Sequence, residues 1–352
     1  MSVLRSSRRL ALLVALVVLV AGLLVGAYAV WSRGSEFQRA VGLLPPETLR
    51  VSWTHWAGLR EELGVTDVSG EAGAAFRQEV ADRDLAASSL GGSTELLVEG
   101  LGLNPLASRW ELLGQGPSGM VMVLALDEDT DVEALAGRFG DLGFDEPDED
   151  PLSGGVWRGG PDVITNVPGL ATFELQNAAF LADEHLLVGS DDADYLDSAL
   201  ASVTGEEDGL AADDLTGRVP TPLAALGLLE DRACEELSLS SAADDAQALG
   251  ERLVEEVGGV TPLAGYLVSL EPDEQISLVF GYEDEGRAER DLDARAALAE
   301  AEDPAQFVAY PELFTLTDAE QEGATVVLRG TTQPDLAPLS HLSEGPVLLA
   351  SC

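Results

Sequence analysis

The sequence has no lysine: all 19 of its basic residues are arginine, and they face 63 aspartate and glutamate residues. The formal net charge at pH 7 is therefore -44 over 352 residues. A chain with this charge repels phosphate backbones, so the composition argues against nucleic acid as a partner. Excess carboxylate without lysine is instead typical of a surface that stays solvated in concentrated salt.

Histidine and the common catalytic motifs are also scarce. The three histidines, His55, His185 and His341, share no metal-ligand spacing, and the H-E-x-x-H pattern is absent. The G-x-S-x-G turn of serine hydrolases is missing as well. The sequence therefore indicates no catalytic, cofactor-binding or metal-ligating residue, and these absences favour a protein that is not an enzyme.

Only two cysteines are present, Cys234 and Cys352. Neither lies near residue 30, which excludes a lipoprotein modification there. An even count outside the cytoplasm permits one disulfide, and we expect Cys352 to end a buried strand beside the start of the second lobe. Two unpaired thiols are the alternative.

The one long hydrophobic run is Leu10 to Val30, which carries no charge and follows Arg5, Arg8 and Arg9. A helix of about 20 apolar residues spans a membrane, and the preceding arginines keep the N-terminus in the cytoplasm. We therefore predict a single-pass cell-membrane protein whose residues from 34 onward are extracytoplasmic. The alternative is a secreted protein, cleaved near Ala29.

The rest of the chain repeats one order of patterns. Residues 120–142 and 276–303 each read as a strand, an acidic turn and a helix, followed by a hairpin and a short helix. The predicted fold is α+β, with an N-terminal transmembrane helix followed by two related α+β lobes with mainly antiparallel sheets. The predicted segments are a cytoplasmic tip and anchor (1–33), a stem (34–47), a first lobe (48–204), an acidic linker (205–222) and a second lobe (223–352).

The acidic turn at Asp127, Asp129 and Asp131 begins like a calcium-binding EF-hand loop. That loop needs glycine at its sixth position and glutamate at its twelfth, where this chain has Val132 and Arg138. We therefore predict that these carboxylates cap the start of a helix. A calcium-stabilised surface module stays as an alternative function.

The segment WTHW, with Trp53, His55 and Trp56, is a candidate surface or pocket. Trp53 and His55 share one face if the segment is a strand. The plainer interpretation is that Trp53 packs in the core and Trp56 covers the start of a helix. A hydrolase site built from His55 and scattered acids is the enzymatic alternative.

The layout resembles actinobacterial membrane-anchored envelope proteins of unknown function. The resemblance rests on the basic N-terminus, the single anchor, LPPET at 44–48, and the segments LLVGSDDADYLDSAL and VVLRGTTQPDLAPL. It implies membrane attachment and supplies no catalytic residues. The resulting hypothesis is a non-catalytic binding or scaffolding protein of the cell envelope, whose partners are envelope proteins or small ligands.

Overall fold

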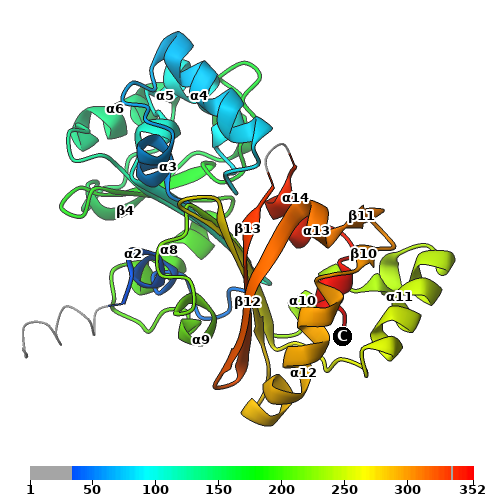
Figure 1. Cartoon of the computed structure of the whole chain (residues 1–352). Coiled ribbons are helices and arrows are strands. Elements are labelled where there is room, and N and C mark those ends of the chain that lie inside the picture. The colour runs from blue at the N-terminus through cyan, green and yellow to red at the C-terminus, as the bar shows by residue number, and fades with distance from the viewer. Residues whose placement is uncertain (1–33, 334–335) are drawn as a thin grey trace, which may run out of the picture.

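A computed structural model describes residues 34–333 and 336–352 of the chain. Within these residues, eleven strands form one antiparallel sheet, in the order β12-β13-β9-β8-β7-β1-β2-β3-β6-β5-β4 (Figure 1). A separate two-stranded ribbon joins β10 to β11. The strands are β1 (Arg50–Thr54), β2 (Trp110–Gly116), β3 (Gly119–Ala125), β4 (Ser153–Arg158), β5 (Asn177–Leu181), β6 (Leu186–Ser190), β7 (Ala224–Leu229), β8 (Gly265–Glu271), β9 (Gln275–Gly281), β10 (Glu302–Asp303), β11 (Val308–Ala309), β12 (Phe314–Glu322) and β13 (Thr325–Thr332).

The two halves of the sheet have matching strand orders around its centre. Reading outward, the first half runs β1, β2, β3, β6, β5, and the second half runs β7, β8, β9, β13, β12. The central strands β1 and β7 pair with each other, with Val51 opposite Gly227 and Trp53 opposite Ala225. The halves are therefore joined by backbone hydrogen bonds through the middle of one sheet.

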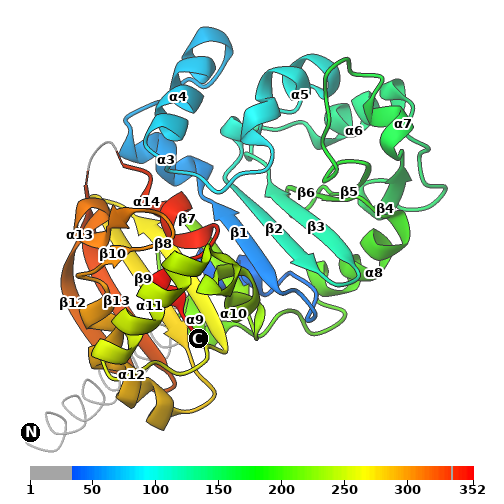
Figure 2. The same ribbon diagram turned by 90° about the vertical axis from the view of Figure 1, so that its right-hand side faces the viewer.

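The helices lie on both faces of this sheet (Figures 1 and 2). They are α2 (Glu36–Val41), α3 (Trp56–Glu62), α4 (Gly70–Asp82), α5 (Thr94–Leu101), α6 (Val132–Leu142), α7 (Pro161–Ile164), α8 (Ala193–Val203), α9 (Asp213–Thr216), α10 (Arg232–Leu237), α11 (Asp244–Glu256), α12 (Glu285–Leu298), α13 (Tyr310–Leu313) and α14 (Pro338–Ser343).

One face of the sheet carries a core that both halves share. Alternate residues of a strand point to opposite faces of the sheet. On this face, Val123 of β3 and Val279 of β9 belong to one cluster, which also contains residues of α2, α8 and α9. The intervening side chains, such as Leu124 and Leu278, point to the other face, where each half has its own core. The shared core makes the halves one structural unit.

The predicted fold is wrong in its division into two separate lobes. The chain has one continuous sheet where we predicted two lobes with separate sheets, because β1 and β7 pair across the boundary. None of the helices among the described residues is long and apolar enough to cross a membrane. The predicted span, Leu10–Val30, lies outside the described residues.

The segments predicted as a stem and a linker both take part in the shared core. The segment 34–47 contains α2, which buries Phe37 and Val41. The segment 205–222 contains α9 and buries Leu215 and Val219.

Acidic residues begin several helices, as the sequence predicts. The Asp131 carboxylate accepts a hydrogen bond from the backbone N–H of Ala134 at 2.9 Å, at the start of α6. Asp192 and Asp284 cap α8 and α12 in the same way. The capping role of Asp131 is confirmed, since its carboxylate satisfies a backbone donor of the first helical turn.

The predicted disulfide is present. Cys234 and Cys352 are bonded, with their Cα atoms 5.7 Å apart. Cys352 does not end a strand as predicted, because it follows a short 3₁₀ turn (Leu348–Ala350). Cys234 lies in α10, directly after β7. The C-terminal segment is buried as expected, but it packs against the second-half core instead of joining the sheet.

Candidate functional site

The segment WTHW marks the change from strand β1 to helix α3. Trp53 belongs to β1, His55 occupies the N-cap position, and Trp56 is the first residue of α3. Trp53 and His55 lie together, with ring centroids 6.0 Å apart. Trp56 enters a different cluster with Leu59 and Phe76, so the structure brings only two of the three candidate residues together.

Trp53 is held rigidly at the centre of an aromatic cluster. Its ring centroid lies 5.3 Å from that of Phe37 in α2 and 5.3 Å from that of Trp110 in β2. Its indole N–H donates to the carbonyl oxygen of Pro222 at 3.0 Å. Trp53 is 1% exposed, so nearly all of its surface packs in the core.

Glu36 completes the site from the N-terminal side. Its carboxylate accepts a hydrogen bond from the Trp110 indole at 3.1 Å and lies 3.6 Å from Nε2 of His55 and 3.8 Å from Arg109. Ser35 and Gln38 form a capping box that starts α2 and so fixes the position of Glu36. Sequence reasoning missed Glu36, although Phe37, Val41 and Leu44 have the spacing of a buried helical face.

These side chains border a hollow of about 490 Å³, which we call the His55 hollow. This volume lies in the range of ligand sites. The remaining wall comes from α2 and from the loop that precedes β7. The lining residues are Gly34, Ser35, Glu36, Phe37, Gln38, Trp53, His55, Gly217, Pro220, Thr221 and Pro222.

Among the residues that line the hollow, Glu36 carries the charge, and the Arg109 guanidinium 3.8 Å from it offsets part of that charge. Burial lowers the pKa of His55 below its ordinary value, and this effect outweighs the opposing effect of the Glu36 carboxylate. His55 is therefore neutral at pH 7. In the neutral imidazole, one ring nitrogen can donate a hydrogen bond and the other can accept one. An aromatic edge, a neutral imidazole and a carboxylate together suit a small neutral or cationic molecule.

Trp56 has a structural role on the other side of β1. Its indole N–H donates to the buried carboxylate of Glu111 in β2 at 3.2 Å. The same carboxylate accepts from the Ser88 hydroxyl at 2.7 Å and from the backbone N–H groups of Ser89 and Leu90 at 2.8 and 3.2 Å. Glu111 thus ties the loop before α5 to the sheet.

We expect Glu111→Gln to flatten the dependence of stability on pH. Burial raises the pKa of the Glu111 carboxyl above its ordinary value of 4.5, although its hydrogen bonds oppose that shift. The folded state then holds a proton that the unfolded state has lost, so this group reduces stability as pH rises above about 4.5. Urea unfolding between pH 4 and pH 8 measures the effect. Parallel profiles for the variant and the wild type would show that Glu111 does not titrate differently on folding.

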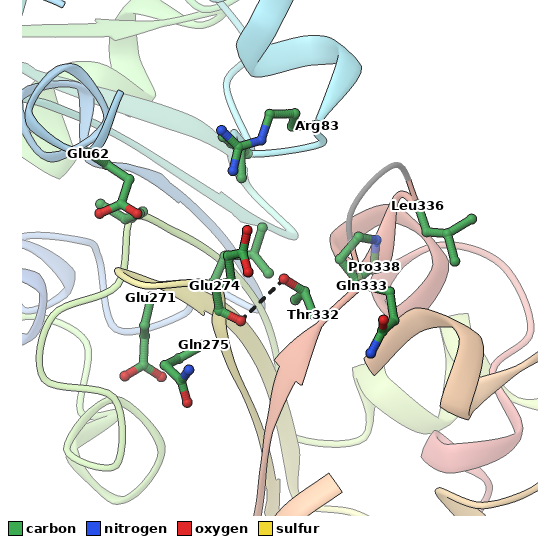
Figure 3. Close-up of a pocket in the computed structure, with 12 residues that line it drawn as sticks. Glu62, Arg83, Glu271, Glu274, Gln275, Thr332, Gln333, Leu336 and Pro338 are labelled. Carbon is green, nitrogen blue, oxygen red and sulfur yellow. Dashed lines mark hydrogen bonds between the residues drawn. The ribbon is translucent and has the colours of Figure 1, made fainter. Parts of the chain in front are cut away.

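A second, smaller cavity lies at the junction of the two halves (Figure 3). Its volume is about 90 Å³, which is below the usual size of a ligand site. Glu62 and Arg83 come from the first half, and Glu271, Glu274 and Gln275 come from β8, β9 and their turn. The structure brings these residues together across the sheet, and no sequence motif marks them.

The β8–β9 turn at this junction has a strained backbone. Asp273 and Glu274 both have positive φ angles, 59° and 60°, which residues with side chains rarely adopt. The Glu62 carboxylate accepts from the Asp273 backbone N–H at 3.2 Å, and the Glu274 carbonyl accepts from the Thr332 backbone N–H at 2.8 Å. These contacts hold the turn in place, so the cavity is best explained as part of the junction between the halves.

The other two histidines lie away from the His55 hollow. His185 occupies the turn between β5 and β6 with φ of 54°, and His341 lies in α14 with its Nδ1 2.7 Å from the Gln306 side chain. Among the described residues, no group of three or more His, Cys, Asp or Glu side chains is placed to hold a metal ion.

Comparison with known proteins gives little further information. No protein-family model matches the sequence, and a search of curated proteins finds no match. The alignment with the structure of TP0453 in crystal form I covers 85% of this chain and 94% of the TP0453 chain, with 8% sequence identity and a TM-score of 0.39. The alignment with crystal form III of TP0453 covers 86% of this chain and 97% of the TP0453 chain, with 9% sequence identity and a TM-score of 0.38. Likeness at this level carries no argument about fold or function.

Proposed function

We propose that this chain is a non-catalytic binding protein of the cell envelope that holds a small neutral or cationic molecule in the His55 hollow. The observation that carries the proposal is the convergence of Glu36, Trp53 and His55 on one hollow of about 490 Å³. A mostly apolar wall with a few fixed polar groups is typical of sites that orient small ligands.

The charge of the protein supports a cationic ligand. The net charge of -44 raises the local concentration of cations around the molecule and repels anions. Within the hollow, the Glu36 carboxylate lies beside the neutral His55 ring, so a bound cation meets one nearby negative charge, which Arg109 balances only in part from 3.8 Å. Both effects disfavour an anionic ligand.

The disulfide supports a place outside the cytoplasm. Disulfides such as Cys234–Cys352 persist in oxidising compartments and are rare where cellular thiols keep cysteines reduced. The resemblance to actinobacterial envelope proteins agrees with that compartment. We therefore place the binding role on the outer side of the cell membrane.

A matched pair of probes tests the proposed site. Benzylammonium and benzoate have similar size and opposite charge, so their affinities separate the effect of charge from that of shape. We expect calorimetry to show benzylammonium binding roughly tenfold more tightly than benzoate, the effect of about one charge at close range. Glu36→Gln should remove that preference, and His55→Ala should weaken both probes.

Glu133→Gln is the control, because Glu133 lies on the exposed first turn of α6 and its loss changes the net charge equally. Equal affinities of the two probes, or equal effects of Glu36→Gln and Glu133→Gln, would contradict binding in the His55 hollow.

A hydrolase is the second candidate, favoured by the 3.6 Å separation of His55 Nε2 from a Glu36 carboxylate oxygen. A carboxylate that orients a histidine can support general-base catalysis. An ester hydrolysis assay distinguishes the two functions. A hydrolase would turn over the ester and lose that activity in His55→Ala, whereas a binding protein would not turn it over.

A further inference from the structure

Phe307 combines two unfavourable features. Its side chain is 81% exposed, and its backbone has a φ of 56°, in the left-handed region that bulky residues avoid. The residue lies in the turn between β10 and β11, the ribbon beside α11 in Figure 1. Single exposed apolar residues are common, but a bulky residue held in a strained backbone is uncommon.

The turn is fixed from the inside by Asp303. The buried carboxylate of Asp303 accepts from the backbone N–H of Ala305 at 2.8 Å, the Tyr310 hydroxyl at 2.6 Å and the backbone N–H of Leu348 at 2.7 Å. The carbonyl oxygen of Asp303 accepts from the backbone N–H of Phe307 at 2.8 Å. The backbone N–H of Gln306 also donates to the Asp303 carboxylate at 3.1 Å, and these five bonds to one residue set the direction of the turn.

The residue before Phe307 is tied down as firmly. The Gln306 side-chain amide donates to the carbonyl oxygens of His341 at 2.8 Å and Pro346 at 3.0 Å, and its oxygen lies 2.7 Å from His341 Nδ1. Gln306 thus points inward while its neighbour Phe307 points into solvent. A preorganised aromatic side chain loses little entropy on binding, which is the usual property of an interface anchor.

The turn that carries Phe307 is flanked by negative charge. Pro304, in the same turn, lies close to helix α11, since its Cγ would be 3.7 Å from a Cβ placed on Gly250. Glu302 and Glu344, both exposed, flank the turn. The patch is therefore an apolar anchor with an acidic rim.

We infer that Phe307 anchors a protein partner that offers an apolar pocket ringed by basic side chains. Charge complementarity selects this partner, because an acidic rim repels acidic surfaces and favours basic ones. A second copy of this chain fits poorly, since each copy carries a net charge of -44. The inference is independent of the ligand proposed for the His55 hollow, and each can fail alone.

The first test asks whether Phe307 serves the fold. Phe307→Gly removes the side chain and relieves the left-handed backbone, so the melting temperature should stay the same or rise. Phe173→Gly is the matched control, since Phe173 is 60% exposed and has no positive φ. A lower melting temperature in Phe307→Gly than in Phe173→Gly would give Phe307 a structural role and overturn the inference.

The second test identifies the partner in the native host. A photo-crosslinking amino acid at position 307 should give one adduct that is absent when the same group replaces Phe173. The purified partner should carry net positive charge, should bind at least 100-fold more weakly to Phe307→Ala, and should dissociate as salt increases. The inference is overturned by the absence of an adduct specific to position 307, by an adduct with a second copy of this chain, or by a partner whose binding ignores salt or Phe307→Ala.

Discussion

Replacing Arg295 with methionine is expected to lower the free energy of unfolding by about 3–5 kcal/mol, the usual cost of breaking a buried ion pair. Arg295 is fully buried on α12 and lies 3.4 Å from the buried Asp291 carboxylate. Its guanidinium also donates to the carbonyl oxygens of Leu349 at 2.6 Å and Thr261 at 3.1 Å, and to the Tyr282 hydroxyl at 3.2 Å. Methionine would leave these acceptors without their donor. It would also leave the buried Asp291 charge without its cation, although Asp291 still accepts from the Thr261 backbone N–H at 2.9 Å.

Arg287→Met is the matched control for this prediction. Arg287 lies on the same helix and pairs with Glu283 and Asp284, but it is 32% exposed. Exposed pairs contribute about 0–1 kcal/mol, so this variant should change stability little. Adding Asp291→Leu to Arg295→Met should restore part of the loss, because it removes the unpaired buried charge. Equal effects of Arg287→Met and Arg295→Met in urea unfolding would contradict the structural role assigned to Arg295.

Removing the disulfide is expected to have an effect of similar size. The bond between Cys234 and Cys352 spans a sequence separation of 118, and the chain-entropy model gives about 4–5 kcal/mol for closing a loop of that length. We expect the double variant Cys234→Ala with Cys352→Ala to lose about 3–5 kcal/mol in urea unfolding. Its unfolding slope against urea should also rise, since the unfolded chain becomes less compact.

Local effects should accompany this global loss. The C-terminal segment is still held by Arg295 through Leu349 and by Asp303 through Leu348, so it should fray without leaving the core. Hydrogen exchange should therefore speed up at the last residues of the chain before other buried positions. Unfolding of the double variant at the same urea concentration as the wild type would show that the bridge contributes nothing to stability.

Local features of the fold follow closely from the sequence. The alternation of apolar and polar residues in LRVSW, residues 49–53, is typical of a strand, and β1 lies there. The acidic turn before Val132 predicts the start of α6 with Asp131 as its cap. These predictions succeed because strand alternation and helix capping depend on neighbouring residues alone. The disulfide could be predicted too, since only two cysteines exist.

The single sheet could not be predicted in the same way. The pairing of β1 with β7 joins residues far apart in the chain, and an alternating strand looks the same whether its neighbour is near or distant in sequence. The acidic composition of the segment 205–222 suggested a linker, yet its few apolar residues, Leu215 and Val219, pack in the shared core. The average composition of a segment does not show that a few of its apolar residues pack in a core.

Only part of the candidate site could be predicted from the sequence. Trp53 and His55 could be placed on one face by strand periodicity, but their partner Glu36 lies in a segment that reads as polar. Trp56 follows the strand end, where the chain turns into α3, so strand alternation no longer applies to it. Its role with Glu111 depends on a contact between two distant segments, which no local pattern records.

The most direct test of the proposed binding site is an NMR titration of the tryptophan indole N–H groups with benzylammonium. The Trp53 indole donates to Pro222 at the wall of the His55 hollow, whereas the Trp157 indole donates to Pro151 at the edge of the first half. Binding in the hollow predicts a saturable shift of the Trp53 signal and an unchanged Trp157 signal. In Glu36→Gln the Trp53 shift should need roughly tenfold more benzylammonium to saturate. A Trp53 signal that stays fixed while calorimetry reports saturation would contradict the proposed site.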